Sequence, residues 1–248
     1  MNRIEHFKEH FKGHREISLN EIFGYFYSKG KTNDKSIRAL LSRWTAQDIL
    51  SRVKKGVYEL TDERKRLYKF SADTVQKKTA KLFEAQYPEL KYSVWNTDSL
   101  NCLMVHQHFA SFYLFETEAD VQENVFYLFK EHKINVFMAD DESILQRYMY
   151  DAKEPVVIKK LVSRSPLTRK DKISHPTLEK ILVDIFIDQS LFNFAQGAEL
   201  INIYNKAFYS YVINITKLLG YADRRKAKES ISNFILNNVN SINVKALL

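Results

Sequence analysis

Residues 18–60 read SLNEIFGYFYSKGKTNDKSIRALLSRWTAQDILSRVKKGVYEL, and this stretch decides the fold of the N-terminal part of the chain. Ser18 and Glu21 have the spacing of a capping box, in which the serine hydroxyl accepts from the N3 amide and the N3 carboxylate reaches back to the N-cap amide. Three apolar side chains follow at helical spacing: Ile22, Phe23 and Phe26. The pattern predicts a helix that begins after Ser18 and ends near Gly30.

A second helix is predicted from the polar segment Lys31–Asp34 to about Gln47. Its apolar positions make one buried face: Ile37, Leu40, Leu41 and Trp44. Its opposite face carries small and basic side chains: Lys35, Ser36, Arg38, Ala39, Ser42 and Arg43. Such a face is typical of a helix that lies in the major groove of DNA, because Arg and Lys reach guanine edges or phosphates while Ser and Ala permit close approach.

Two short strands, Ile49–Val53 and Val57–Leu60, are predicted next, joined by a basic turn in which Gly56 permits a positive φ. An earlier amphipathic stretch, Ile4–Phe11, predicts the first helix of a three-helix core. Three helices followed by a hairpin form a winged helix-turn-helix, whose wing grips phosphates or the minor groove. The candidate DNA-binding residues on the reading helix and the wing are Asn33, Lys35, Ser36, Arg38, Ser42, Arg43, Arg52, Lys54 and Lys55.

The net charge of +8 is concentrated in the same region. Residues 1–70 hold 16 Lys/Arg and 9 Asp/Glu, whereas the rest of the chain holds 22 and 21. A basic block of domain size beside a nearly neutral one indicates a nucleic-acid-binding module fused to a second domain. We therefore expect residues 1–68 to bind double-stranded DNA. A solvated basic face, or a winged helix that docks a protein instead of DNA, remains the alternative.

From Phe70 onward, helices and strands alternate at a spacing that favours an α/β layer with a mixed or parallel sheet. Helices are predicted at 72–86, 100–105, 121–132 and 142–150. Strands are predicted at 92–95, 109–115, 135–138 and 156–161. After Pro176 the chain is predicted to be helical, at 178–188, at 199–219 in one or two helices, and at 223–237. The expected fold class is α/β (α+β overall), with a domain at 69–248 that ends in a helical segment at about 176–240.

The placement of glycine argues against several classes of enzyme. The chain has 6 glycines, and none lies between Val57 and Gln196. A P-loop, a dinucleotide fingerprint and a nucleophile elbow all need glycine next to a strand, as does the Gly-Ser turn of nucleotidyltransferases. Two sets of carboxylates remain, Asp140–Glu142 and Asp151 with Glu154, but Pro155 follows Glu154 where a metal-dependent nuclease would continue Glu-x-Lys. We expect no catalysis and no cofactor.

Other residues give weaker indications. His6, His10 and His14 would share a helix face, but the single cysteine, Cys102, gives them no support and we expect no metal site. One cysteine, a charged N-terminus and no apolar run of about eighteen residues together predict a cytoplasmic protein without a membrane partner. Two basic clusters outside the first domain are possible secondary contacts to phosphate or an acidic partner: Arg164, Arg169, Lys170 and Lys172, and Arg224, Arg225, Lys226 and Lys228.

Two segments resemble a known family. The hairpin Ile-Leu-Ser-Arg-Val-Lys-Lys-Gly-Val-Tyr-Glu-Leu (49–60) is similar to the start of AbiEi-type antitoxins, the repressor half of type IV toxin–antitoxin and phage abortive-infection operons. The segment ISHPTLEKILVD (173–184) resembles one that the family shows after its last strand, with Glu179-Lys180 where the family often has Glu-Arg. No motif is placed after residue 190.

The resemblance implies a DNA-binding domain that represses its own operon from an operator. It also implies a C-terminal domain that counteracts a nucleotidyltransferase-like toxin without a stable complex. Two alternatives to this function stay open: a metal-dependent nuclease that the winged helix delivers to DNA, and a winged-helix subunit that docks a protein.

Overall fold

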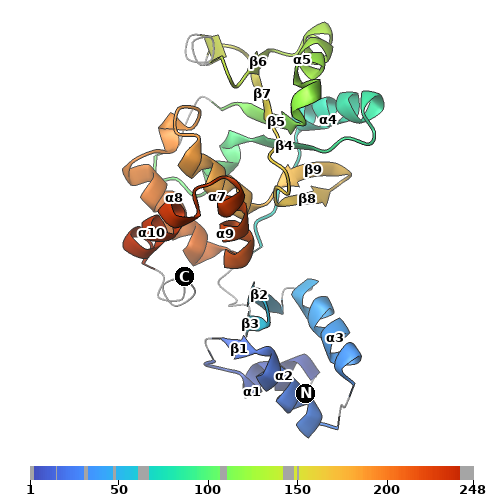
Figure 1. Cartoon of the computed structure of the whole chain (residues 1–248), viewed down its shortest axis with the longest axis vertical. Coiled ribbons are helices and arrows are strands. Elements are labelled where there is room, and N and C mark those ends of the chain that lie inside the picture. Colours follow the sequence, from blue (N-terminus) through green and yellow to red (C-terminus); the bar gives the residue numbers. More distant parts are fainter. Residues whose placement is uncertain are drawn as a thin grey trace.

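The computed structural model describes residues 3–14, 16–30, 33–46, 49–60, 67–106, 111–141, 148–149 and 151–240. The fold is α+β: a small unit of three helices and a short sheet lies at the N-terminal end, and a larger mixed sheet with helices forms the rest (Figure 1). The N-terminal unit has its own hydrophobic core, drawn from residues 7–50. The two remaining core clusters are drawn from residues 70–239.

Three helices enclose the N-terminal core: α1 (Arg3–His10), α2 (Leu19–Ser28) and α3 (Asp34–Ala46). This core is largely aromatic. The ring of Phe7 lies 4.7 Å from that of Trp44 and 5.8 Å from that of Phe26, measured between centroids. One side chain from each helix therefore meets at the centre, where aromatic groups bury the most area per residue.

A three-stranded antiparallel sheet completes this unit: β1 (Ile17–Ser18), β2 (Leu50–Lys54) and β3 (Val57–Leu60), in the order β1-β3-β2. The hairpin of β2 and β3 lies where the sequence predicts it, and Gly56 in its turn has φ +78°. Strand β1 was not predicted, because two residues are too few to show an alternating pattern. It exists only by pairing with Val57 and Tyr58 of β3.

The predicted capping box at α2 is present. The backbone N–H of Glu21 donates to Ser18 Oγ at 3.2 Å, and the N–H of Ser18 donates to Glu21 Oε2 at 2.7 Å. We expect Ser18→Ala to lower the free energy of unfolding by about 1 kcal/mol, since an unpaired helix-terminal amide remains. Ser42→Ala, an exposed position within α3, is the matched control and should leave denaturant unfolding unchanged. Equal effects of the two substitutions would contradict a role for the cap.

The large sheet contains β4 (Tyr92–Asn96), β5 (Tyr113–Thr117), β7 (Val156–Lys160) and β6 (Val136–Met138), in the order β4-β5-β7-β6. Strand β4 is antiparallel to β5, whereas β5, β7 and β6 are parallel. The sheet is therefore mixed, which is one of the two arrangements that the alternation of helices and strands left open. The carboxyl ends of β5 and β7 lie at the same edge, because Thr117 pairs with Lys160.

Helices cover both faces of this sheet. Helices α4 (Thr74–Gln86) and α5 (Gln122–Glu131) pack on the face that carries Phe115 and Ile158. The other face, with Leu114 and Val157, packs against the C-terminal helices. These are α7 (Leu178–Ile187), α8 (Ala198–Ser210), α9 (Ile215–Arg224) and α10 (Lys228–Asn238). None of the described helices is long and apolar enough to span a bilayer.

The structure contains a hairpin that the sequence did not predict. Strands β8 (Leu167–Lys170) and β9 (Ile173–Pro176) form a two-stranded sheet, and β9 lies beside β4. The turn residues Asp171 and Lys172 both have positive φ, 51° and 66°. A tight turn of this kind is usually marked by glycine or asparagine, which Asp-Lys lacks. The segment 173–184 therefore begins inside the last strand, not after it.

Several other boundaries differ from the prediction. Helix α9 continues to Arg224, beyond the predicted end at 219, and α10 begins at Lys228 instead of 223. The helix expected at 100–105 is a 3₁₀ helix, η1 (Thr97–Leu100), which Asn96 caps by accepting from the amide of Asp98 at 2.9 Å. The strand expected at 109–115 begins at Tyr113 and continues to Thr117. Short 3₁₀ helices also occur at η2 (Ala119–Val121) and η4 (Asn193–Ala195). The helix expected at 142–150 falls almost wholly outside the described residues.

Candidate functional site

Helix α3 has one buried and one exposed face. Ile37, Leu41 and Trp44 are 0%, 1% and 2% exposed. The predicted contact residues of this helix and its N-terminal turn are all exposed: Asn33, Lys35, Ser36, Arg38, Ser42 and Arg43. The sequence folds this way because its apolar residues recur every three or four positions, so that burying them turns the remaining side chains to solvent. The exposed face of α3 is therefore available to a ligand along the whole length of the helix.

Two of these residues also have partners within the chain. Asn33 Oδ1 accepts from the backbone N–H of Lys35 at 3.0 Å, so Asn33 helps to begin the helix. The guanidinium carbon of Arg38 lies 5.2 Å from the ring centroid of Phe23 on α2. Lys35 and Arg43, in contrast, form no ion pair with any described residue. Their charges are the ones most available to phosphate.

The hairpin presents a second set of basic residues. Arg52 and Lys55 are exposed, whereas the side chain of Lys54 lies outside the described residues. Helix α9 of the C-terminal part lies close to β2 (Figure 1). One strand of the hairpin thus faces the second half of the chain, a relation between distant segments that the sequence did not indicate.

A buried charge cluster joins the sheet to the C-terminal helices. It contains three cations and three carboxylates: Lys159, Lys180, Arg225, Glu116, Asp184 and Asp188. Lys180 and Glu116 have fully buried side chains, and Lys180 Nζ donates to Glu116 Oε1 at 2.7 Å and Oε2 at 2.6 Å. Lys180 also pairs with Asp184, one turn along α7.

Arg225, at the end of α9, extends the buried charge cluster toward the surface. Its Nη2 donates to Asp188 Oδ1 at 2.8 Å, and its Nη1 donates to Asp184. Tyr221 Oη donates to the same carboxylate at 2.9 Å, and Lys159 of β7 pairs with Asp188. The contacts tie β5, β7, α7 and α9 into one unit with balanced charge.

Burial is the largest influence on the ionisation of this cluster. It raises the pKa of Glu116 above its usual value, although the charge of Lys180 opposes the shift. Burial acts in the same direction on the pKa of Asp184, but the nearby cations, Lys180 first, outweigh it and hold that pKa below its usual value. Burial lowers the pKa of Lys180, whereas the carboxylates of Asp184 and Glu116 raise it. The effect of the carboxylates is larger, so the pKa lies above its usual value. The surroundings therefore favour the charged forms of Asp184 and Lys180, whereas burial opposes the charge of Glu116.

The buried charge cluster is structural, because its central atoms have no access to solvent or substrate. It was missed from the sequence, although a signal was present. Lys180 and Asp184 interrupt an otherwise apolar helix, LEKILVDIFI, at a spacing of four. Charged side chains within such a buried segment must find partners, since an unpaired charge is very costly to desolvate.

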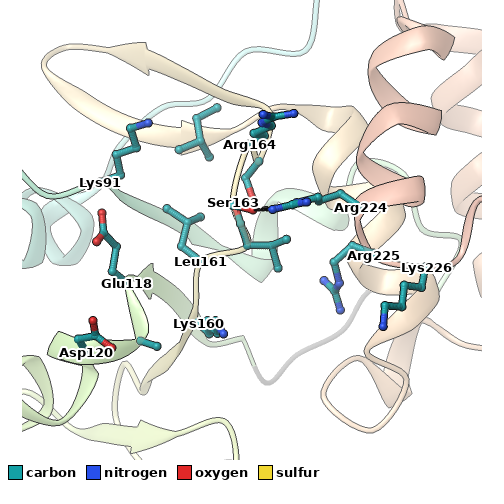
Figure 2. A pocket seen from close by; sticks show the side chains of 14 residues that line it. Lys91, Glu118, Asp120, Lys160, Leu161, Ser163, Arg164, Arg224, Arg225 and Lys226 are labelled. Carbon is teal, nitrogen blue, oxygen red and sulfur yellow. Dashed lines mark hydrogen bonds between the residues drawn. The ribbon is translucent and has the colours of Figure 1, made fainter.

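A cavity of about 890 Å³ opens at the carboxyl ends of β5 and β7 (Figure 2). Its charged lining consists of six basic and two acidic residues: Lys91, Lys160, Arg164, Arg224, Arg225, Lys226, Glu118 and Asp120. Arg164 and Arg224 come from the two separate basic clusters of the sequence, and the fold brings them to one site. Arg224 Nε donates to Ser163 Oγ at 2.8 Å, which joins the β7–β8 loop to α9.

The other members of the first basic cluster lie elsewhere. Arg169 pairs with Glu84 at 2.7 Å, Lys170 Nζ donates to the carbonyl of Phe70 at 2.8 Å, and Lys172 occupies the hairpin turn. Arg225, predicted as a secondary contact, is neutralised from within by the buried charge cluster. Arg169, Lys170 and Arg225 therefore stabilise the fold through internal partners, which leaves them less available to a ligand.

The remaining polar candidates do not converge. Among the described residues, no group of three or more His, Cys, Asp or Glu side chains lies close enough to hold a metal ion. The ring of His10 packs against Phe11 and Tyr25, at 4.7 and 4.8 Å between centroids. Cys102 is an exposed free thiol. Glu142 lies outside the described residues.

Comparison with known proteins gives a family but no function. No curated protein sequence matches this chain significantly. One family of unknown function matches residues 36–241, a range that begins inside α3 and ends just beyond α10. The matched range includes most of α3, the hairpin, the buried charge cluster and the cavity. The chain therefore belongs to the family of unknown function DUF6577.

Proposed function

We propose that this protein is a non-enzymatic transcriptional repressor that reads double-stranded DNA with the exposed face of α3. The observation that carries the proposal is the separation of that helix into a buried apolar face and an exposed polar and basic one. Side chains of this kind recognise base edges and phosphates in the major groove. The free charges of Lys35 and Arg43 favour DNA over a neutral protein partner.

The order of elements supports the proposal. Helix, strand, helix, helix and two strands follow one another from α1 to β3, and this is the order of a winged helix-turn-helix. In that arrangement α3 is the reading helix, and the hairpin with Arg52 and Lys55 is the wing. The surplus of basic residues in this part of the chain supplies the sequence-independent attraction to phosphate.

Fluorescence anisotropy on labelled duplexes tests the proposal. We expect the intact protein to bind the duplex upstream of its own reading frame more tightly than a scrambled duplex. Between about 50 and about 200 mM salt, log K should fall linearly with log salt concentration, by roughly 0.9 per phosphate contact. Absence of binding at the lowest salt, or a flat salt response, would overturn the proposal. So would magnesium-dependent cleavage of the duplex that Asp141→Ala abolishes, since this would indicate a nuclease.

A narrower function follows from the resemblance to AbiEi-type antitoxins. In this form of the proposal the protein is cytoplasmic, represses its own operon and counteracts a nucleotidyltransferase-like toxin encoded beside it, without a stable complex. Expression of the neighbouring frame alone should arrest growth, and co-expression of this chain should restore it. Because antitoxicity is assigned to residues 69–248, a variant with Lys35→Ala and Arg43→Ala should restore growth equally well. A neighbour that is not toxic, or toxicity that this chain does not relieve, would leave only the DNA-binding function.

A further inference from the structure

The cavity at the carboxyl ends of β5 and β7 has one basic wall and one side of mixed charge. One wall, called here the basic wall, consists of Arg164 from the β7–β8 loop and Arg224 and Lys226 from the end of α9. On the opposite side lie the carboxylates of Glu118 and Asp120, which follow β5, with Lys91 beside Glu118 and with Lys160 at the end of β7 (Figure 2). Apolar side chains complete the lining: Ala119, Leu161, Val162 and Leu167.

The position of the cavity is one at which α/β proteins bind ligands. Strands β5 and β7 are parallel, and the loops that follow them supply Glu118, Asp120 and Arg164 to the lining. In open α/β sheets, ligands occupy the crevice outside the carboxyl ends of such strands. A volume of about 890 Å³ also lies within the range of small-molecule sites, roughly 300–1,000 Å³. Location and size therefore favour a small ligand.

The positive charge of the basic wall is not neutralised from within. Neither Arg164 nor Lys226 forms an ion pair with another described residue, and Arg224 donates to the neutral hydroxyl of Ser163. Arg225 is different, because Asp184 and Asp188 hold its guanidinium. Three cations without carboxylate partners on one wall attract an anion with several negative charges.

The backbone of the basic wall is held in place before any ligand binds. Arg164 and Lys226 have left-handed φ values of 59° and 57°. This region is uncommon for residues other than glycine, and at the end of a helix such as α9 glycine is the usual occupant. Here both positions retain a long cation that lines the cavity. Two neighbouring residues are also held by internal contacts. Arg225 is paired within the buried charge cluster, and Arg224 donates a hydrogen bond to Ser163.

We propose that this cavity binds a nucleoside di- or triphosphate, with its phosphates on the basic wall. Guanidinium groups bind phosphate oxygens through short, charge-assisted hydrogen bonds. Ribose hydroxyls and exocyclic amines are the donors that the acceptor-only carboxylates of Glu118 and Asp120 require. The same two carboxylates repel a continuous phosphate chain, which disfavours a nucleic-acid strand across the cavity. The site is thus separate from the DNA surface proposed on α3.

Titration calorimetry of the intact protein tests the proposal, with ATP, GTP, CTP and UTP as separate probes in EDTA. Pyrophosphate and the free nucleosides are the comparison arms. We expect at least one nucleotide to bind saturably, its nucleoside not to bind, and pyrophosphate to bind more weakly. Lys226→Asn should weaken nucleotide binding by about tenfold or more, as loss of one hydrogen bond to a charged group predicts. Asn is chosen because it tolerates a left-handed backbone, so the substitution should leave the local fold unchanged.

Lys172→Asn is the matched control. It removes the same charge at another exposed left-handed position, φ 66°, in a turn that does not line the cavity, and it should leave nucleotide affinity unchanged. Arg224→Gln provides a second test of the basic wall and should also weaken nucleotide binding. Glu118→Gln should weaken the nucleotide but not pyrophosphate.

Three results would overturn the proposal. The first is the absence of saturable binding by every nucleotide. The second is pyrophosphate binding as tight as that of the best nucleotide, with no effect of Glu118→Gln. The third is a loss of duplex affinity in Lys226→Asn that Lys172→Asn does not share, which would make the cavity part of the DNA surface. Failure of duplex binding alone would leave the nucleotide site standing.

Discussion

Replacing Lys180 by methionine should lower the free energy of unfolding by about 3 to 5 kcal/mol, the largest effect on stability expected in this protein. The ammonium group is fully buried and is shared by Glu116 and Asp184. Methionine fills similar volume, so packing is largely kept, but two carboxylates lose their central counterion in a medium that does not solvate them. Urea denaturation followed by circular dichroism measures the change.

Two variants control this experiment. Lys180→Arg keeps the charge at the same position and should retain much of the lost stability. Lys228→Met makes the same chemical change at an exposed position of α10 and should alter stability by less than about 0.5 kcal/mol. If Lys180→Met were as stable as the native chain at neutral pH, the buried charge cluster would contribute nothing to the fold.

The difference in free energy of unfolding between the native chain and Lys180→Met should become smaller as the pH falls. The pKa of Asp184 is held below its usual value in the native protein, so its contribution to stability is lost only below that usual value and stays constant between about pH 7 and about pH 5 in the native protein. The pKa of Glu116 is raised by burial, and removing Lys180 raises it further, so the variant relieves its uncompensated charge by binding a proton. The free-energy gap between the two proteins should therefore be smaller at about pH 5 than at about pH 7. A gap that does not change with pH would contradict this account.

Removing Lys35 and Arg43 together should weaken duplex binding by roughly 100-fold, since each interaction with a base edge or phosphate contributes about 1 to 3 kcal/mol. Both side chains are exposed on α3 and form no ion pair with a described residue, so the native fold loses little. The slope of log K against log salt should become shallower by about one for each phosphate that the variant can no longer bind. Anisotropy titrations at several salt concentrations measure both quantities.

The matched control removes two lysines from the same basic region but from outside α3. Lys12→Ala with Lys29→Ala makes the same change in net charge at exposed positions. It should weaken binding only slightly, through the general attraction to phosphate. Equal losses in the two double variants would show that net charge, and not the face of α3, governs binding. Arg38→Ala should have a smaller effect than Arg43→Ala, because its guanidinium lies over the ring of Phe23.

Local patterns made much of the N-terminal unit predictable. Helix α3 follows from apolar residues three and four apart, and Ser18 with Glu21 shows where α2 begins. Gly56 marks the hairpin turn. Each of these signals acts over a few residues, because helical periodicity, caps and turns depend on neighbours in the chain. The exposure of the α3 face followed from the same periodicity.

Other features depend on pairing between distant segments, and the sequence did not indicate them. Strand β1 exists only through β3, and the β8–β9 hairpin turns on Asp171 and Lys172, without the glycine that usually marks such a turn. The approach of α9 to β2 likewise follows from how the two parts of the chain pack.

By itself, then, the sequence determined the exposed polar face of α3, the hairpin and the alternation of helices and strands around the larger sheet. Tertiary structure alone decided the buried charge cluster and the cavity. Lys180 contacts Glu116, which is 64 residues away in the sequence, and Arg224 contacts Ser163, which is 61 residues away. Such partners are brought together by strand order and helix packing, which no local period encodes. The same packing explains why Arg164, Arg224 and Lys226 have no carboxylate partner among the described residues, while Arg169 and Arg225 are held by carboxylates.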